Sequence, residues 1–332
     1  MAMKKFINDP ANLTKELLEG LVSCYKGRVK LVSDRIVVRA TPKDESKVAI
    51  VTLGGSGHEP ALSGYVGEGM LDASVVGDVF AAPGAPKLLE ALRLLKRDAG
   101  IVLVTLNHAG DRMSASKALR DAEKEGIKVR EIVTHDDISA GIDADPEDKR
   151  GLAGCVPLYK VIGAAAEAGK SLEEIVDIGE RFNRQVATLA VAMTGCTHPQ
   201  NGEPITVLPD DEMEIGMGQH GEAGGGRTKI LTADETAARM IAPLMQATGV
   251  KAGDTALLII NGVGATTLME MLIVYRKAAQ ILADKGINVT SGACGEYLTV
   301  QEMGGFQMIL CKLDADHREY LSAPARTPYW NA

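Results

Sequence analysis

The sequence predicts a two-domain α/β protein in which each domain has a mostly parallel or mixed sheet flanked by helices. Three observations support this class. The 332 residues suffice for two hydrophobic cores, helix-type and strand-type periodicities alternate along the chain, and glycine-rich loops follow several expected strands. Ligands of open α/β sheets bind beside such loops, at the carboxyl ends of the strands. We expect one domain over residues 1–185 and a second over 186–332.

The N-terminal domain is expected to begin with a helix at 10–25, because its leucines recur at helical spacing. The apolar run at 47–53 ends in glycines, as a buried strand does. The remaining elements follow in the order helix 87–97, strand 100–107, helix 114–126, strand 128–137, and helices at 151–169 and 171–186. This βαβα order predicts a largely parallel sheet.

The C-terminal domain is richer in strands. Its expected strands lie at 187–193, 211–218, 254–262, 288–298 and 306–314, and its expected helices at 233–248 and 266–284. No internal repeat, coiled coil or low-complexity linker interrupts this pattern, which is typical of a globular protein.

Composition, charge and hydropathy argue against several classes of function. The formal net charge is -8 and the pI is about 5.4, which disfavours nucleic acid because phosphate contacts need clustered Lys and Arg. No apolar run is long enough to span a bilayer, and the N-terminus lacks a secretory signal. The five cysteines are scattered without a CxxC pair, which indicates buried thiols in a reducing compartment. We therefore expect a cytoplasmic protein without nucleic-acid or membrane partners.

The segment GGSGHEP (54–60) follows an expected strand and carries a candidate acid–base group. Its glycines allow backbone N–H groups to converge on an anion or a carbonyl oxygen. His58, held at a strand end, can act as acid or base near neutral pH, although a plain strand-to-helix turn is the alternative. Ser56 misses the GxSxG frame by one position, so a serine triad is not expected.

The segment LNHAGDRMS (106–114) places Asp111 close to His108. Asp111 either only caps the helix that begins there, or caps it and still orients or deprotonates a ligand hydroxyl. Two further carboxylates, in THDDIS (134–139), are expected in a solvated loop. The segment NGVGATTLME (261–270) has the form of a phosphate-binding turn, but it contains no basic residue.

His220 lies among glycines in EIGMGQHGEAGG (214–225), with Glu222 as an acidic neighbour. The roles open to it are turn residue, phosphate-loop residue, metal ligand and nucleophile. Metal binding is disfavoured because HxH, HxxxH and CxxC spacings are absent. A histidine that acts as a nucleophile, with His58 and Asp111 supplied by the other domain, is a hypothesis that the residues alone leave open.

Several long motifs occur in an order that resembles one known family. They are GGSGHEPALSGYVGEGMLDASVVGDVF, NHAGDRMS, RGLAGCVPLYKVIGAAAEAGKSLEEI, DEMEIGMGQHGEAGG, NGVGATTLMEMLIVYR and GEYLTVQEMGGF. Together they resemble the substrate-binding (K) subunits of dihydroxyacetone kinases over essentially the whole chain. The resemblance implies a two-domain α/β homodimer that holds a short-chain ketose, and a phosphotransferase subunit that needs a partner for turnover.

The resemblance also implies roles for individual residues. The histidine of the family's G-x-G-x-H-G-E segment, here His220, attacks the substrate ketone and forms a reversible hemiaminal, which a polyol cannot do. His58 and Asp111 match the family's second histidine and its aspartate, which deprotonate the terminal hydroxyl and polarise the bound ketose. The implied substrate site consists of Gly55, Ser56, Gly57, His58, Leu106, His108, Asp111 and His220.

Nothing in the sequence matches a nucleotide or metal site. A Walker A loop, a kinase glycine loop with its lysine, and a carboxylate cluster for Mg²⁺ are all missing. The resemblance implies that ATP, or ADP recharged by a phosphotransferase-system protein, lies with Mg²⁺ on an L-type partner subunit. Because the sequence stops at Ala332, we expect that partner to be a separate chain, and no cofactor or metal on this one.

Three positions depart from the family pattern. Leu106 stands where a lysine is usual, His108 replaces a tyrosine, and Ala223 replaces a proline. Leu106 and His108 would flank the pocket, so erythrulose or another short ketose is an alternative to dihydroxyacetone. A second alternative is a non-catalytic paralogue that acts as a regulator, for example a co-activator of a transcription factor. Such a paralogue would be expected to lose a catalytic group, whereas this chain keeps all three.

Overall fold

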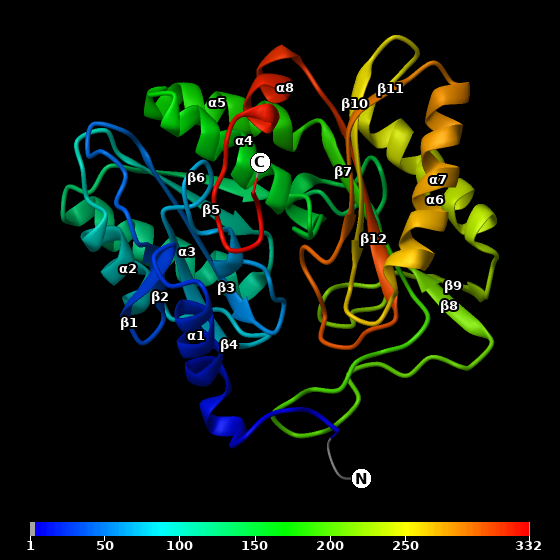
Figure 1. The fold of residues 1–332 in the computed structure, drawn as a ribbon, viewed down its shortest axis with the longest axis horizontal. Helices are drawn as coiled ribbons and strands as arrows, with labels where there is room; N and C mark the ends of the chain where they lie inside the picture. The colour runs from blue at the N-terminus through cyan, green and yellow to red at the C-terminus, as the bar shows by residue number, and fades with distance from the viewer. Residues whose placement is uncertain (1–3, 332) are drawn as a thin grey trace. The chain divides into compact units, whose positions relative to one another are not determined.

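The structure is a computed structural model that describes residues 4–331, and its contacts divide the chain into two compact units (Figure 1). The N unit contains residues 4–134, 155–181 and 316–331, and the C unit contains 135–154 and 182–315. Each unit has one mixed six-stranded sheet with helices, which confirms the expected α/β class. The contacts group 135–154 with the later half of the chain and 316–331 with the earlier half, a finer division than one boundary near 185.

The sheet of the N unit combines parallel and antiparallel strands. They are β1 (Val29–Ser33), β2 (Ile36–Arg39), β3 (Ala49–Ser56), β4 (Ala73–Val79), β5 (Ile101–Leu106) and β6 (Val129–Thr134). The order is β1-β2-β4-β3-β5-β6, in which the last four strands run parallel while β1 and β2 pair antiparallel. The predicted strands β3, β5 and β6 are confirmed. The sequence did not predict β1, β2 or β4, and charged residues interrupt the short runs of β1 and β2.

Helices pack on both faces of this sheet. The helices of this unit are α1 (Leu13–Cys24), α2 (Ala85–Leu94), α3 (Ala109–Lys124), α4 (Cys155–Glu167), α5 (Leu172–Asn183) and α8 (Ala315–Ser322), with 3-10 turns η1 (Pro10–Asn12) and η2 (Ser63–Tyr65). Alternate residues of β3 face opposite sides, as the pleat requires. Val51 and Leu53 join the core with α2 and α3, whereas the hydroxyl of Thr52 meets that of Tyr159 on α4.

The sheet of the C unit is mainly antiparallel. Its strands are β7 (Val186–Ala192), β8 (Glu212–Ile215), β9 (Gly226–Lys229), β10 (Thr255–Gly262), β11 (Asn288–Gly295) and β12 (Gly305–Lys312), in the order β11-β10-β12-β7-β8-β9. Among the described residues, β10 and β11 form its one parallel pair. The unit also contains the 3-10 turn η3 (Pro146–Asp148).

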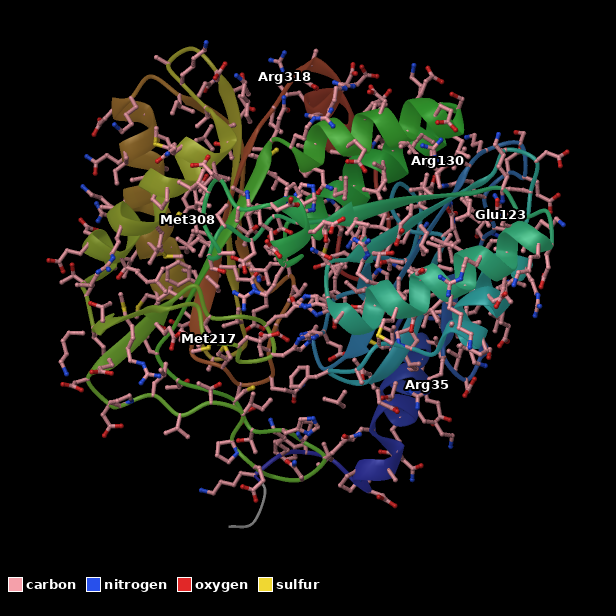
Figure 2. All side chains as sticks on the ribbon, turned by 180° about the vertical axis from the view of Figure 1, so that it is seen from behind. Arg35, Glu123, Arg130, Met217, Met308 and Arg318 are labelled. Atoms are coloured by element: carbon pink, nitrogen blue, oxygen red, sulfur yellow. The ribbon has the colours of Figure 1, made fainter. Side chains whose placement is uncertain are left out.

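Two long helices cover the C-unit sheet. The helices α6 (Ala233–Thr248) and α7 (Leu268–Asp284) contact each other and lie side by side in Figure 1. Their buried residues, including Leu244 and Val274, pack against strand residues such as Met308, which is labelled in Figure 2. Both helices begin with a capping box, which satisfies N–H groups that have no partner within the helix.

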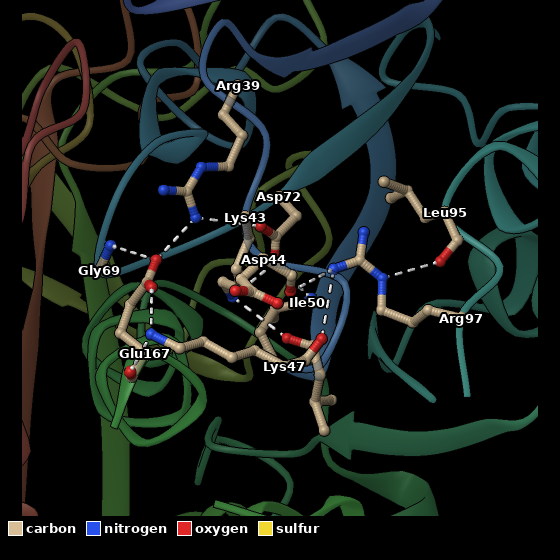
Figure 3. A network of polar contacts seen from close by, with 11 residues as sticks. Arg39, Lys43, Asp44, Lys47, Ile50, Gly69, Asp72, Leu95, Arg97 and Glu167 are labelled. Atoms are coloured by element: carbon tan, nitrogen blue, oxygen red, sulfur yellow. Dashed lines mark hydrogen bonds and ion pairs between the residues drawn. The ribbon is translucent and has the colours of Figure 1, made fainter. Parts of the chain in front are cut away.

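A buried ion-pair network joins β2, β4 and α4 within the N unit (Figure 3). Asp72 is 2% exposed and accepts hydrogen bonds from Lys43 Nζ at 2.7 Å, Arg39 Nη1 at 3.2 Å and the Ile50 N–H at 2.8 Å. Arg39 also pairs with Glu167 at the end of α4, at 2.6 Å. These donors compensate the cost of burying the Asp72 carboxylate.

Two expectations concern membrane-spanning helices and the exposure of the cysteines. None of the helices described between residues 4 and 331 is long and apolar enough to cross a membrane. All five cysteines are free thiols, but Cys24 on α1 is exposed and Cys294 is only half-buried. The expectation of buried thiols was therefore wrong for these two, because the sequence does not show which side of a helix or strand faces solvent.

Candidate functional site

The candidate acid–base residues of the N unit lie at the carboxyl ends of two neighbouring parallel strands. Leu53 of β3 pairs with Thr105 of β5, so the loops 54–60 and 107–111 leave the same edge of the sheet. Seven predicted site residues lie at this edge, namely Gly55, Ser56, Gly57, His58, Leu106, His108 and Asp111. His220 belongs to the C unit and is described with it.

His58 is held by an aromatic neighbour. The residue is 5% exposed, and its ring centroid lies 4.9 Å from that of Phe80. The preceding residue, Gly57, has a φ of 98°, and a Cβ there would come within 2.9 Å of the Phe80 ring. Glycine is thus required for the imidazole to reach its place at the strand end.

Glu59 follows His58 and folds back on the loop. Its two carboxylate oxygens accept the Gly57 N–H at 3.1 and 3.0 Å. Burial raises the pKa of Glu59 to about 6, because the loss of water outweighs the backbone hydrogen bonds that favour the charged form. No role for this carboxyl was predicted from the sequence, and in the structure it closes the glycine loop on itself.

Ser56 and Gly55 have structural partners on the side of α1. Ser56 Oγ lies 2.9 Å from Thr14 Oγ1, and both side chains are buried. A cavity of about 330 Å³ lies between α1 and the loop, and of the predicted site residues Gly55 alone lines it in the described structure. The acid–base residues therefore do not form this cavity.

Asp111 lies in the first turn of α3 and does not cap it. The helix begins at Ala109 rather than at 114, and its N-cap is His108, whose side chain makes no capping hydrogen bond. Asp111 is 8% exposed, and the unpaired N–H groups of a helix start favour a carboxylate there. The interpretation of Asp111 as the N-cap was therefore wrong.

Leu106 and His108, the two residues at this edge that depart from the family pattern, differ in how exposed they are. Leu106 ends β5 and is 3% exposed, so it is a core residue of the N unit. His108 is half-buried and donates its backbone N–H to the Leu106 carbonyl at 2.7 Å. Contact between either side chain and a substrate remains a prediction.

A buried chain of hydroxyl groups near Asp111 was not predicted from the sequence. The hydroxyl of Tyr159 lies 3.0 Å from Thr52 Oγ1, which donates to the Val104 carbonyl at 3.0 Å. Burial raises the pKa of Tyr159 well above its usual value, and the nearby groups of Cys155 and Asp111 act in the same direction. A tyrosine within an apolar helix looks like a core residue in sequence, so only the fold places it here.

His220 lies on the connection 216–225 between β8 and β9 of the C unit. Its backbone N–H donates to Glu222 Oε2 at 2.9 Å, and its Nδ1 lies 3.3 Å from Glu222 Oε1. Burial raises the pKa of Glu222, but the hydrogen bonds and charge of His220 lower it more, to about 2. Glu222 is thus ionised at neutral pH, so Nδ1–H is the donor and the lone pair of the neutral imidazole lies on Nε2.

Arg150 anchors this loop, although the sequence did not single it out. Its Nη2 donates to the Gly216 carbonyl at 2.7 Å and to Ser139 Oγ at 2.8 Å, and its Nε donates to Asp137 Oδ2 at 2.7 Å. Its Nη1 lies 3.8 Å from Glu222 Oε2. The rigid fork of one arginine therefore positions both the start of the loop and the carboxylate that holds His220.

The loop glycines are required by close packing within the C unit. A Cβ on Gly218 would lie 2.0 Å from Glu222 Oε2 and 2.3 Å from Arg150 Nη1. Gly216 has a φ of 91°, in the left-handed region that favours glycine. The glycines thus allow the arginine and the glutamate to approach the backbone on either side of His220.

The carboxylates in 134–139 are buried, so the expectation of a solvated loop was wrong. Asp136 and Asp137 are each 1% exposed. Asp136 accepts the N–H groups of Leu152 and Gly154, and burial raises its pKa in spite of these hydrogen bonds. The donors come from residues well along the chain, which is why the sequence did not reveal them.

The turn at 261–270 is a poor anion site. At the start of α7, Glu270 accepts the Thr267 N–H at 2.9 Å as part of a capping box. A carboxylate at this helix start satisfies the donors that a phosphate would use and repels its charge. The phosphate-like pattern of glycines here is therefore a structural turn.

Replacing Glu222 with Gln is expected to remove a pH-dependent part of the free energy of unfolding. The pKa is about 2 in the folded state against an ordinary 4.5, so ionised Glu222 stabilises the protein above about pH 4.5. That contribution is lost as the pH falls toward 2. Urea unfolding across this range should show a steeper loss for the wild type than for the variant. Glu203→Gln, an exposed carboxylate of the same unit, is the control, and equal slopes in all three proteins would contradict the pairing with His220.

Comparison with known proteins shows similarity over the whole chain. A model of the Dak1 domain matches residues 19–329. The dihydroxyacetone-binding subunit DhaK of PTS-dependent dihydroxyacetone kinase 1 from Listeria innocua is 39% identical over 329 residues, which cover 99% of this chain and 100% of that protein. The L-erythrulose kinase of Pectobacterium atrosepticum is 34% identical over 98% of this chain and 56% of its own length.

A solved structure extends the comparison to the fold. The dihydroxyacetone kinase operon co-activator Dha-DhaQ is 32% identical and matches with a TM-score of 0.90, over 96% of this chain and 98% of its own. The family model spans most residues of both units. The resemblance seen in the sequence motifs is thus confirmed, and the chain belongs to the Dak1 family of dihydroxyacetone-binding (DhaK) subunits.

Proposed function

We propose that this protein is the substrate-binding subunit of a short-chain ketose kinase, with dihydroxyacetone as the first candidate substrate. The pairing of His220 with ionised Glu222 carries the proposal, because it leaves the imidazole lone pair on Nε2. A neutral imidazole nitrogen can add to a ketone but not to a polyol. Covalent capture would select carbonyl compounds and fix the hydroxyl that receives the phosphoryl group.

The proposed capture step conserves charge and atoms. Nε2 of His220 donates its lone pair to the carbonyl carbon, and the electron pair of the C=O bond moves to oxygen. That oxygen takes a proton from an acid and becomes the hydroxyl of a hemiaminal. The ring gains a positive charge and keeps its Nδ1 proton against Glu222, whose carboxylate stabilises the adduct.

His58 and Asp111 are the proposed acid and base. Both lie at the carboxyl edge of the N-unit sheet, with exposures of 5% and 8%. One would supply a proton to the ketose oxygen and the other would accept the proton of the terminal hydroxyl as it attacks the phosphoryl group. The backbone of 55–57 would line the same site, and Leu106 and His108 would flank the ketose.

Phosphoryl transfer needs a nucleotide, which we place with Mg²⁺ on a separate L-type subunit. The Listeria innocua relative, matched over its full length, is named as the dihydroxyacetone-binding subunit of a PTS-dependent kinase. The donor would be ATP, or ADP recharged by a phosphotransferase-system protein. In this proposal the chain itself, in the homodimer typical of the family, binds the ketose and no nucleotide.

A coupled assay tests the proposal. The protein, an L-type subunit and a phosphoryl donor are incubated with dihydroxyacetone, both erythrulose enantiomers, and glycerol. We expect phosphorylation of at least one ketose and none of glycerol, because glycerol offers no carbonyl to His220. The absence of product with every ketose and both donor systems would reject a kinase role.

A regulatory role is the second candidate, favoured by the likeness to the co-activator Dha-DhaQ. A regulator would form the ketose adduct without turnover in the coupled assay. Erythrulose is the competing substrate, supported by the similarity to the L-erythrulose kinase. Relative kcat/KM values for the ketoses would decide between the substrates.

A further inference from the structure

A small polar cavity in the N unit is lined by three arginines. It measures about 50 Å³ and is bounded by Gly27, Arg28, Arg39, Thr41, Glu68 and Arg326. It shares no lining residue with the loops 54–60 and 107–111 or with the 330 Å³ cavity beside α1. The space is several times the roughly 10–15 Å³ that one water needs, so a small ion fits.

Arg39 is a largely buried residue whose guanidinium has unused donors. It is 8% exposed, and only its Nη1 is engaged, by Asp72 and Glu167. Figure 3 shows its other two nitrogens pointing away from both carboxylates, without a dashed line. Within residues 4–331 neither nitrogen has a hydrogen-bond partner. Both nitrogens keep contact with solvent, so they can donate to an anion that enters the cavity without first losing a partner within the described chain.

The other two arginines add charge to the same cavity. Arg28 uses Nη1 to hold Thr327 O and Asn331 Oδ1, both at 2.8 Å, which leaves its remaining N–H groups available. The side chain of Arg326 makes no hydrogen bond or ion pair with any residue of the described chain, although its backbone N–H donates to Glu68 O. Two cations therefore stand at the cavity with donors to spare.

The nearby carboxylates do not neutralise these arginines. Glu68 lines the cavity, but within the described chain its carboxylate lies within 4.0 Å of no Lys or Arg nitrogen. Asp72 also forms an ion pair with Lys43 Nζ at 2.7 Å, and Glu167 also forms one with Lys47 Nζ at 3.7 Å. The local balance is therefore positive.

We propose that this cavity, the arginine pocket formed by Arg28, Arg39 and Arg326, binds a tetrahedral oxyanion, either inorganic phosphate or the phosphate end of a monoester. A planar guanidinium group can donate two parallel hydrogen bonds to two oxygens of one phosphate. Three such groups on separate segments supply donors on several sides of the ion. Bound phosphate would join the β1–β2 hairpin to the C-terminal segment that Arg28 already holds.

Calorimetric titration of the full chain with sodium phosphate, with methyl phosphate, and with sodium chloride at equal ionic strength tests the proposal. We expect saturable heat with phosphate and none with chloride. Arg326→Gln should raise the Kd roughly tenfold, equivalent to about 1.4 kcal/mol. Arg318→Gln, an exposed arginine of the same unit labelled in Figure 2 that does not line the cavity, should leave the Kd unchanged.

Each outcome decides for or against the site. Tighter binding of methyl phosphate than of phosphate assigns the site to a monoester, and the reverse assigns it to the free ion. The proposal would be overturned if Arg326→Gln and Arg318→Gln weakened phosphate binding equally. It would also be overturned if phosphate gave no more heat than chloride. Arg28→Gln gives an independent check, because loss of the Arg28 guanidinium should weaken phosphate binding but leave ketose capture at His220 unchanged. The result is thus separable from the proposed kinase function.

Discussion

Replacing His220 with Gln is expected to abolish the covalent ketose adduct and to lower turnover by at least roughly 10²-fold, because the captured carbonyl is no longer held in position. The amide cannot add to a ketone, but it is close to imidazole in size and keeps a polar group beside Glu222. The adduct is read by ¹³C NMR with dihydroxyacetone labelled at the carbonyl carbon. The ketone signal should be replaced by a protein-bound tetrahedral carbon in the wild type alone.

His198→Gln is the matched control for this experiment. His198 lies in the same unit, is half-buried, and accepts the Gln200 N–H on Nδ1. Its replacement should leave both the adduct and the turnover near wild-type values. A tetrahedral carbon that persists in His220→Gln would show that another group captures the ketose.

Replacing Asp111 with Asn is expected to slow phosphoryl transfer while leaving covalent capture of the ketose intact. The amide preserves the shape of the side chain in the first turn of α3 but cannot accept a proton. Loss of a general base typically lowers turnover by about 10²–10⁴-fold. The hemiaminal should still form, because that bond depends on Nε2 of His220. The two readouts are the coupled assay with the L-type subunit and the same NMR measurement.

Glu123→Gln on the same helix makes the matching change from carboxylate to amide. Glu123 is exposed near the far end of α3 and is labelled in Figure 2. It should retain wild-type turnover. Loss of the adduct in Asp111→Asn would show that Asp111 acts in capture rather than in transfer. Unchanged turnover would remove Asp111 from the proposed acid–base pair.

The fold was predictable where the chemistry is local. Apolar runs bounded by glycines identified β3, β5 and β10, and helical spacing identified α1, α6 and α7. The strands β1, β2, β4 and β9 were not predicted, and in β1 and β2 a few apolar residues between charges carry too little periodicity. We expected α3 to begin later than it does. The segment NHAGD shows no recognisable N-cap pattern, because the side chain of the N-cap residue makes no capping hydrogen bond.

For the site, the sequence determined the reactive groups, and the tertiary structure decided what surrounds them. Glycine-flanked histidines and an aspartate after a strand are local features, so His58, Asp111 and His220 could be named from residue type and family motif. Arg150, Asp137 and Tyr159 could not, because their partners are distant along the chain and only folding brings donor and acceptor within hydrogen-bond distance. The same holds for the burial of Asp136 and for the pKa of Glu222, since desolvation is a property of packing.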